Sequence, residues 1–72
     1  MSIGNNIYSL RKAKKVTQAQ LAEKLGVSEQ AVSKWEQGRS CPDIAILDEI
    51  ADALGISLIE LLGMEKRSKN SS

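Results

Sequence analysis

The chain has 72 residues and a formal net charge of +1 at pH 7, and a chain of this length forms one domain that depends on a single hydrophobic core. It contains no histidine and one cysteine, Cys41, which excludes an intramolecular disulfide. No long apolar run predicts a membrane span, and the polar N-terminus does not resemble a secretory signal, so we expect a cytoplasmic protein.

The small net charge hides an uneven distribution along the chain. Residues 1–40 contain seven Lys and Arg residues against three acidic ones, whereas residues 41–64 contain five acidic residues and no basic one. A polyanion would therefore meet the molecule on one side only. The tail at 65–72 has no apolar residue, and this composition predicts disorder. We therefore predict one domain over residues 1–64, followed by a disordered polar tail.

The first predicted helix runs from about Asn5 to Lys14. Its buried stripe consists of Ile3, Ile7 and Leu10. Arg11 lies one turn after Ile7, at the edge of this stripe, and therefore needs a partner. Glu36 lies one turn after Val32, at the edge of the face that a later helix would bury. We predict an ion pair between Arg11 and Glu36, with two solvated side chains as the alternative.

Residues 18–36 contain two short amphipathic segments joined by a tight corner. Their apolar faces consist of Leu21, Ala22 and Leu25 in the first segment and Val32 and Trp35 in the second. Gly26 can take the positive φ that ends the first helix. Thr17 and Ser28 are the predicted N-caps, and Gln20 completes a capping box with Thr17. The outline is that of a helix-turn-helix.

The fourth predicted helix spans residues 44–54, after Pro42 and Asp43. Its apolar side consists of Ile44, Ile46, Leu47, Ile50, Ala51, Ala53 and Leu54. The opposite side is acidic and carries Asp48, Glu49 and Asp52. Two carboxylates one turn apart resemble half of a metal site, but no His, Cys or third carboxylate converges on them. We therefore interpret this side as a solvated acidic face.

Ser57 and Glu60 form a second predicted capping box, which opens a short fifth helix. This helix carries four apolar residues in five positions: Leu58, Ile59, Leu61 and Leu62. One face of a single turn cannot bury all four, so we expect part of the set to be exposed. We predict that Leu58, Leu61 and Leu62 form a homodimer contact, with ordinary surface leucines as the alternative.

The segment at 18–36 resembles the phage-repressor, Cro/C1-type (XRE) helix-turn-helix family. The matching positions are Gln18, Leu21, Ala22, Leu25, Gly26, Val27, Val32 and Trp35, followed by the exit sequence Trp35-Glu36-Gln37-Gly38-Arg39. The resemblance covers about residues 3–63. It implies an all-α, compact five-helix, lambda-repressor-like fold and the ion pair of Arg11 with Glu36. It also implies sequence-specific binding to double-stranded DNA. Some relatives have glutamine where this chain has Glu29 and Lys34, so no operator sequence can be transferred.

The polar side of the second motif helix lies opposite Val32. On it, Gln30 matches the N6 and N7 edge of adenine, and Lys34 matches O6 and N7 of guanine. Ser33 is small enough to let the helix approach closely, and Glu29 can accept from cytosine N4. Exposed helices also carry Gln and Lys for solubility, but their place on this helix favours base reading.

Four further residues are predicted to contact phosphate: Gln18, Ser28, Gln37 and Arg39. The lysines at 12, 14 and 15 fit a phosphate contact and a solvated helix end equally well. Each phosphate contact would position the helices without reading sequence.

The sequence favours a non-catalytic protein without metal or cofactor. It has no histidine, no base next to Cys41, no glycine-rich phosphate loop and no cluster of metal ligands. The predicted function is transcriptional regulation, most simply repression by a dimer on a near-palindromic operator. The alternative is a protein-interaction module, such as an antitoxin-like subunit or a coactivator, that docks a partner on its fourth and fifth helices.

Overall fold

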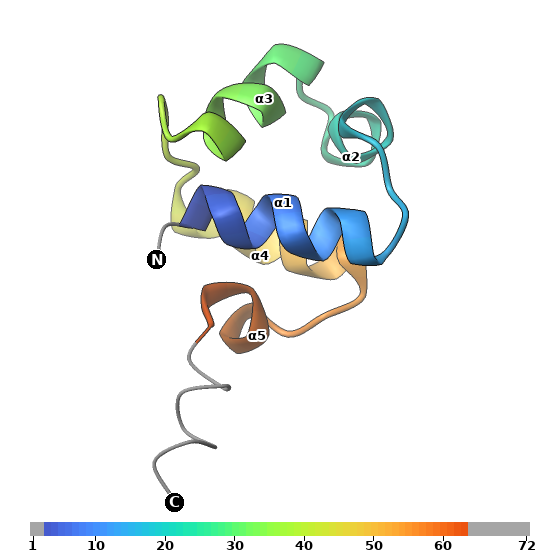
Figure 1. Ribbon diagram of the computed structural model, residues 1–72, viewed down its shortest axis with the longest axis vertical. Helices are drawn as coiled ribbons and strands as arrows, with labels where there is room; N and C mark the ends of the chain where they lie inside the picture. The colour runs from blue at the N-terminus through green and yellow to red at the C-terminus, as the bar shows by residue number, and fades with distance from the viewer. Residues whose placement is uncertain (1–2, 64–72) are drawn as a thin grey trace, which may run out of the picture.

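The computed structural model describes residues 3–63, and all regular structure in that range is helical. The helices are α1 (Ile3–Ala13), α2 (Gln18–Leu25), α3 (Glu29–Gln37), α4 (Ile44–Leu54) and α5 (Leu58–Leu62) (Figure 1). The predicted all-α, five-helix fold is confirmed. The first helix starts at Ile3 instead of Asn5, because Ile3 itself packs against the core. The predicted disordered tail at 65–72 lies outside the described residues.

Helix α1 lies at the centre of the arrangement and packs against α3, α4 and α5 (Figure 1). Helix α2 packs against α3 and α4. The buried hydrophobic side chains are Ile7, Leu21, Ala22, Val32, Trp35, Leu47, Ile50, Ala51, Leu54 and Leu61. Together these contacts hold α2 and α3 on one side of α1 and α5 on the other. The longest helices within residues 3–63 have 11 residues, which is too few to span a membrane.

The helix ends follow the predicted cap chemistry. The hydroxyl of Thr17 accepts from the amide of Gln20, whose side chain accepts in turn from the amide of Thr17. At Ser57 only the serine half of the predicted box is present, where the hydroxyl accepts from the amide of Glu60. Gly26 ends α2 with φ 72°, which makes the corner of the motif. The helix-turn-helix is therefore fixed locally, at both of its ends and at its corner.

Ile44 differs from the prediction, because it is 64% exposed instead of lying on the apolar side of its helix. It stands in the first turn of α4, directly after the N-cap Asp43. The apolar side of α4 that reaches the core begins at the partly buried Ile46 and continues with Leu47. The helical period therefore assigned one residue too many to the buried side.

Gly4 lies where α1 approaches the last turn of α3. A Cβ atom at this position would overlap the carbonyl oxygen of Trp35 and lie 3.1 Å from that of Glu36. Both neighbours are backbone atoms, which cannot rotate away as a side chain can. The absence of a side chain at Gly4 therefore sets how closely α1 and α3 approach each other.

We expect Gly4→Ala to destabilise the domain, although alanine favours helix formation over glycine by about 1 kcal/mol. The added methyl forces α1 and α3 apart, and such overpacking costs about 1 to 3 kcal/mol. Urea unfolding monitored by circular dichroism measures the change. Ser9→Ala, at an exposed position of the same helix, is the control and should leave stability nearly unchanged. An increase in stability for Gly4→Ala would contradict the close contact.

Candidate nucleic-acid interface

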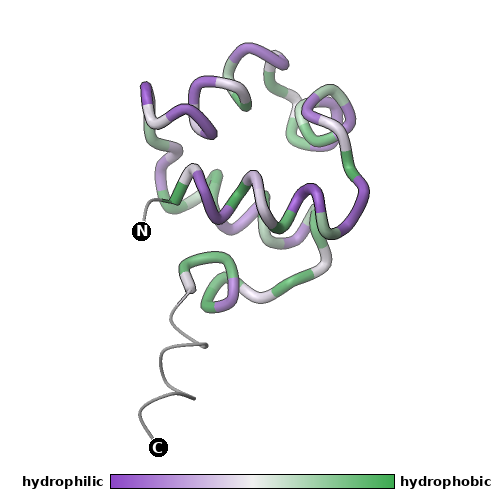
Figure 2. The backbone as a smooth tube through the Cα atoms, viewed as in Figure 1, coloured by the Kyte–Doolittle hydropathy of each residue, from purple (hydrophilic) through white to green (hydrophobic). Residues whose placement is uncertain are grey.

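Helix α3 presents a polar face to solvent. Val32 and Trp35 are buried beneath it, Gln30, Lys34 and Gln37 are exposed on the opposite side, and Glu29 is exposed in the first turn to one side of them. Ser33 differs from these four because it is partly buried. Figure 2 shows hydrophilic residues along the length of α3, whereas α5 is mostly hydrophobic. The side chains predicted to read base edges thus lie together on one accessible helix.

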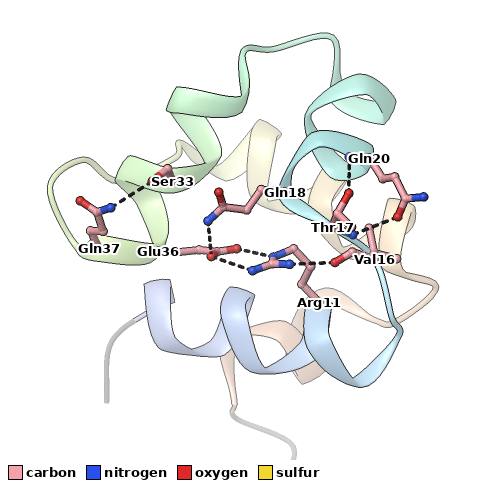
Figure 3. Close-up of polar contacts among 8 residues, drawn as sticks. All are labelled: Arg11, Val16, Thr17, Gln18, Gln20, Ser33, Glu36 and Gln37. Atoms are coloured by element: carbon pink, nitrogen blue, oxygen red, sulfur yellow. Dashed lines mark hydrogen bonds and ion pairs between the residues drawn. The ribbon is translucent and has the colours of Figure 1, made fainter.

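Ser33 and Gln37 are joined along this face. The Nε2 of Gln37 donates to the Oγ of Ser33 at 3.0 Å (Figure 3). The spacing of four residues brings the two side chains together on consecutive turns of α3. The hydroxyl of Ser33 is therefore engaged, which restricts the direction in which Gln37 points.

The ion pair predicted between Arg11 and Glu36 is present and buried (Figure 3). Arg11 Nε donates to Glu36 Oε2 at 2.7 Å, and Nη2 donates to Oε1 at 3.1 Å. The side chains are 8% and 5% exposed. Arg11 Nη1 also donates to the carbonyl oxygen of Val16 at 2.8 Å. One guanidinium thus ties α1 to α3 and to the segment that leads into α2.

Hydrogen bonding to the carboxylate of Glu36 raises the pKa of Arg11 above its ordinary value, and burial opposes this shift less strongly. A base whose pKa is raised in the folded state stabilises the fold at every pH below its unfolded-state value. Arginine in an unfolded chain already has a pKa far above the physiological range, so the charge of Arg11 is present throughout that range.

The side chain of Gln18 points to Glu36. Its Nε2 donates to Glu36 Oε1 at 2.9 Å, so the amide predicted to hold a phosphate is already bonded within the protein (Figure 3). The hydroxyl of Ser28 accepts from the amide of Ala31 and caps α3. Arg39 is exposed in the loop that follows α3. Of the predicted phosphate contacts, Arg39 and Gln37 therefore present exposed side chains, while Gln18 is turned inward.

The acidic face of α4 is exposed, as the sequence pattern indicates. It borders a hollow of about 260 Å³ between α4 and the start of α5. The hollow is lined by Asp48, Glu49, Ala51, Asp52, Ile56, Ser57 and Leu58. A surface of this charge repels a polyanion, so DNA would be kept away from this part of the molecule.

Leu61 cannot form the predicted dimer contact, because it is fully buried. Leu58 and Leu62 are partly buried against the core, and Ile59 is the exposed member of the helix at 55%. Asn6 links α1 to α5, because its Nδ2 donates to the carbonyl oxygen of Leu61 at 2.9 Å. The packing of α5 against α1 and α4 buries the side chain of Leu61. The sequence offered no signal for the hydrogen bond of Asn6 beyond a polar residue next to the buried Ile7.

A family model for the helix-turn-helix matches residues 7–61. The chain is 38% identical over 65 residues to the immunity repressor protein of Bacillus phage phi105. It is 40% identical over 70 residues to the cryptic phage CTXphi transcriptional repressor RstR of Vibrio cholerae. These matches cover 90% and 97% of this chain but 45% and 62% of the two relatives. The chain thus spans less than two thirds of the length of either repressor.

The fold is similar to that of the P22 c2 repressor protein, whose crystal structure was determined in complex with the synthetic operator 9T. The TM-score is 0.77 at 34% sequence identity, and the match covers 85% of this chain and 92% of the other. At this identity the similarity extends to the sequence as well as to the arrangement of helices.

Arg11→Ala tests whether the ion pair is desolvated. The substitution leaves the carboxylate of Glu36 buried without its cation, and breaking a buried pair in this way costs about 3 to 5 kcal/mol. Urea unfolding measures the loss. A loss below about 1 kcal/mol, as found for solvated pairs, would contradict the buried pair. Lys14→Ala, at an exposed position just after α1, is the control and should change stability by no more than about 0.5 kcal/mol.

Proposed function

This chain belongs to the Cro/C1-type helix-turn-helix family, and we propose on that basis that it binds double-stranded DNA sequence-specifically and regulates transcription. The observation that carries the proposal is the exposed polar face of α3, a helix that is held to α1 by the buried ion pair of Glu36 with Arg11. A helix held this rigidly, with its polar side outward, suits insertion into the major groove. This role makes the chain a DNA-binding regulator and not an enzyme.

Recognition would rest on the side chains of α3. In the major groove every base pair presents a distinct pattern of donors and acceptors. Gln30 would read adenine and Lys34 would read guanine, each with about 1 to 3 kcal/mol of discrimination. Glu29 can accept from cytosine N4, and its charge disfavours sites where a phosphate would come close. Ser33 is hydrogen-bonded to Gln37, so it would let α3 approach the bases closely instead of reading a base itself.

The phosphate contacts would lie at both ends of the motif. The start of α2 offers backbone amides to an anion, and Arg39 offers an exposed guanidinium in the loop after α3. The N-cap residue Ser28 and Gln37, the last residue of α3, are exposed at the two ends of that helix. Such contacts fix the position of α3 in the groove, and their number sets the salt dependence of binding.

The working form would be a homodimer that occupies a near-palindrome and blocks a promoter. Two copies of α3 would then enter the major groove about 34 Å apart. Because Leu61 is buried, the contact between the copies is assigned to Ile59, bordered by the partly buried Leu58 and Leu62. These three residues form a continuous apolar edge of α5.

A second candidate function is supported by the hollow between α4 and α5. It combines apolar residues such as Ile56 with the carboxylates of Asp48 and Asp52. A protein segment that is both basic and apolar would complement it. The fold would then serve as a protein-interaction module, as in an antitoxin-like subunit or a coactivator, with DNA binding as a secondary property or absent.

Selection of bound sequences from a random duplex pool tests the primary proposal. We expect a two-fold symmetric site, and we expect Gln30→Ala to relax one position in each half because the bidentate contact is lost. Ser9→Ala, at an exposed position of α1, is the control and should leave every preference unchanged. Failure to enrich any sequence, with residual binding that depends on salt alone, would favour the interaction module instead.

Ile59→Asp tests the dimer. We expect the wild-type chain to self-associate in sedimentation experiments and the variant to sediment as a monomer, since a charge on the apolar edge of α5 opposes the contact. Thermal stability should change little, because Ile59 is exposed in the monomer. Tyr8→Asp replaces an exposed apolar residue on α1 and should leave association intact. A monomeric wild-type chain that still binds a symmetric site would place the dimer contact elsewhere.

A further inference from the structure

Gln18 connects the start of α2 to the last turn of α3. Its half-buried side chain donates from Nε2 to Glu36 Oε1 at 2.9 Å, and Arg11 donates two more hydrogen bonds to the same carboxylate. Figure 3 shows Gln18 reaching down to Glu36 from one side and Arg11 from the other. Three hydrogen bonds thus converge on one carboxylate, and Gln18 supplies the one that comes from α2.

A phosphate at the start of α2 does not need the side chain of Gln18. The first amides of a helix have no intrahelical partner and suit an anion. In α2 the hydroxyl of Thr17 takes the amide of Gln20, and this leaves the amides of Gln18 and Ala19 for a ligand. The backbone at this point can therefore hold a phosphate while the side chain remains where it is.

Release of Gln18 from Glu36 would be unfavourable. Hydrogen bonds to a carboxylate are stronger than those between neutral groups, and a partly buried oxygen that loses its donor is poorly compensated by water. The negative charge of Glu36 is already balanced by Arg11, whose Nε lies 2.7 Å from Oε2. A phosphate that binds nearby therefore does not displace the Glu36 side chain by repulsion. The bond between Gln18 and Glu36 should thus persist when DNA binds.

We propose that Gln18 is a positioning residue: the amides at the start of α2 hold a phosphate, and the Gln18 side chain, through Glu36, fixes α3 relative to that phosphate. This inference rests on the proposed function and deepens it. Hydrogen bonds to base edges tolerate displacements of only a few tenths of an ångström. Sequence-specific binding therefore depends on the link from Gln18 to Glu36, whereas non-specific binding to the DNA backbone does not.

Gln18→Met distinguishes a positioning role from a direct phosphate contact, because it keeps the length of the side chain and removes its hydrogen bond to Glu36. We expect affinity for the selected site to fall about tenfold, while affinity for an unrelated duplex at the same salt concentration stays unchanged. Glu23→Gln, at an exposed position of the same helix, is the control: it changes one charge and should leave the ratio of the two affinities unchanged. An equal fall in both affinities for Gln18→Met would overturn the inference and identify a simple phosphate contact.

The side-chain amide of Gln18 gives a second readout in nuclear magnetic resonance spectra of the intact chain. On addition of the selected duplex we expect the backbone amides of Gln18 and Ala19 to shift strongly and the side-chain amide of Gln18 to shift little. The reverse pattern would overturn the inference and leave the proposed function intact. No shift at any residue of α2 or α3 would overturn the proposed function, and the inference with it.

Discussion

The buried ion pair between Arg11 and Glu36 is the interaction on which the orientation of α3 depends. Apolar contacts between helices are not directional, so they hold α1, α2 and α3 together without fixing their rotation. The two hydrogen bonds from Arg11 to Glu36, with a third from Arg11 to the carbonyl of Val16, are directional and leave the carboxylate little freedom. Desolvation of the two charges offsets most of their attraction. The pair therefore determines the arrangement of the helices more than it adds to their stability, and it restricts the rotation of α3, whose polar face lies opposite the buried Val32 and Trp35.

Features that depend on local periodicity and cap chemistry were predictable from the sequence. The helix-turn-helix between Thr17 and Glu36 follows from apolar spacing, two N-cap residues and the glycine at the corner, each of which acts within one or two turns. The partner of Arg11 was also predictable, because a charge at the edge of a buried stripe requires an opposite charge, and Glu36 stands at the matching position of the third helix. The exposed polar face of α3 follows from the same period.

Features that depend on how distant helices meet were not predictable. The burial of Leu61 follows from the packing of α5 against α1 and α4, and α5 is also hydrogen-bonded to Asn6, 55 residues earlier in the chain. The closeness of α1 and α3 follows from Gly4, which in the sequence resembles any weak helix position. Gln18 matched the pattern of a phosphate contact, yet its side chain bonds to Glu36, because the crossing of α2 and α3 brings the two together. In each case the helical period predicts on which face of its helix a residue lies, but the role of the residue depends on its contact with another helix.

The placement of α3 in the major groove is tested most directly by methylation interference on the sequence that the chain selects. Dimethyl sulfate methylates guanine at N7, which faces the major groove, and adenine at N3, which faces the minor groove. Insertion of α3 with Lys34 at a guanine predicts that N7 methylation of guanines within each half-site blocks binding, whereas N3 methylation of adenines in the same half-sites does not. Interference confined to N3 positions, or none at either groove, would contradict major-groove reading by α3.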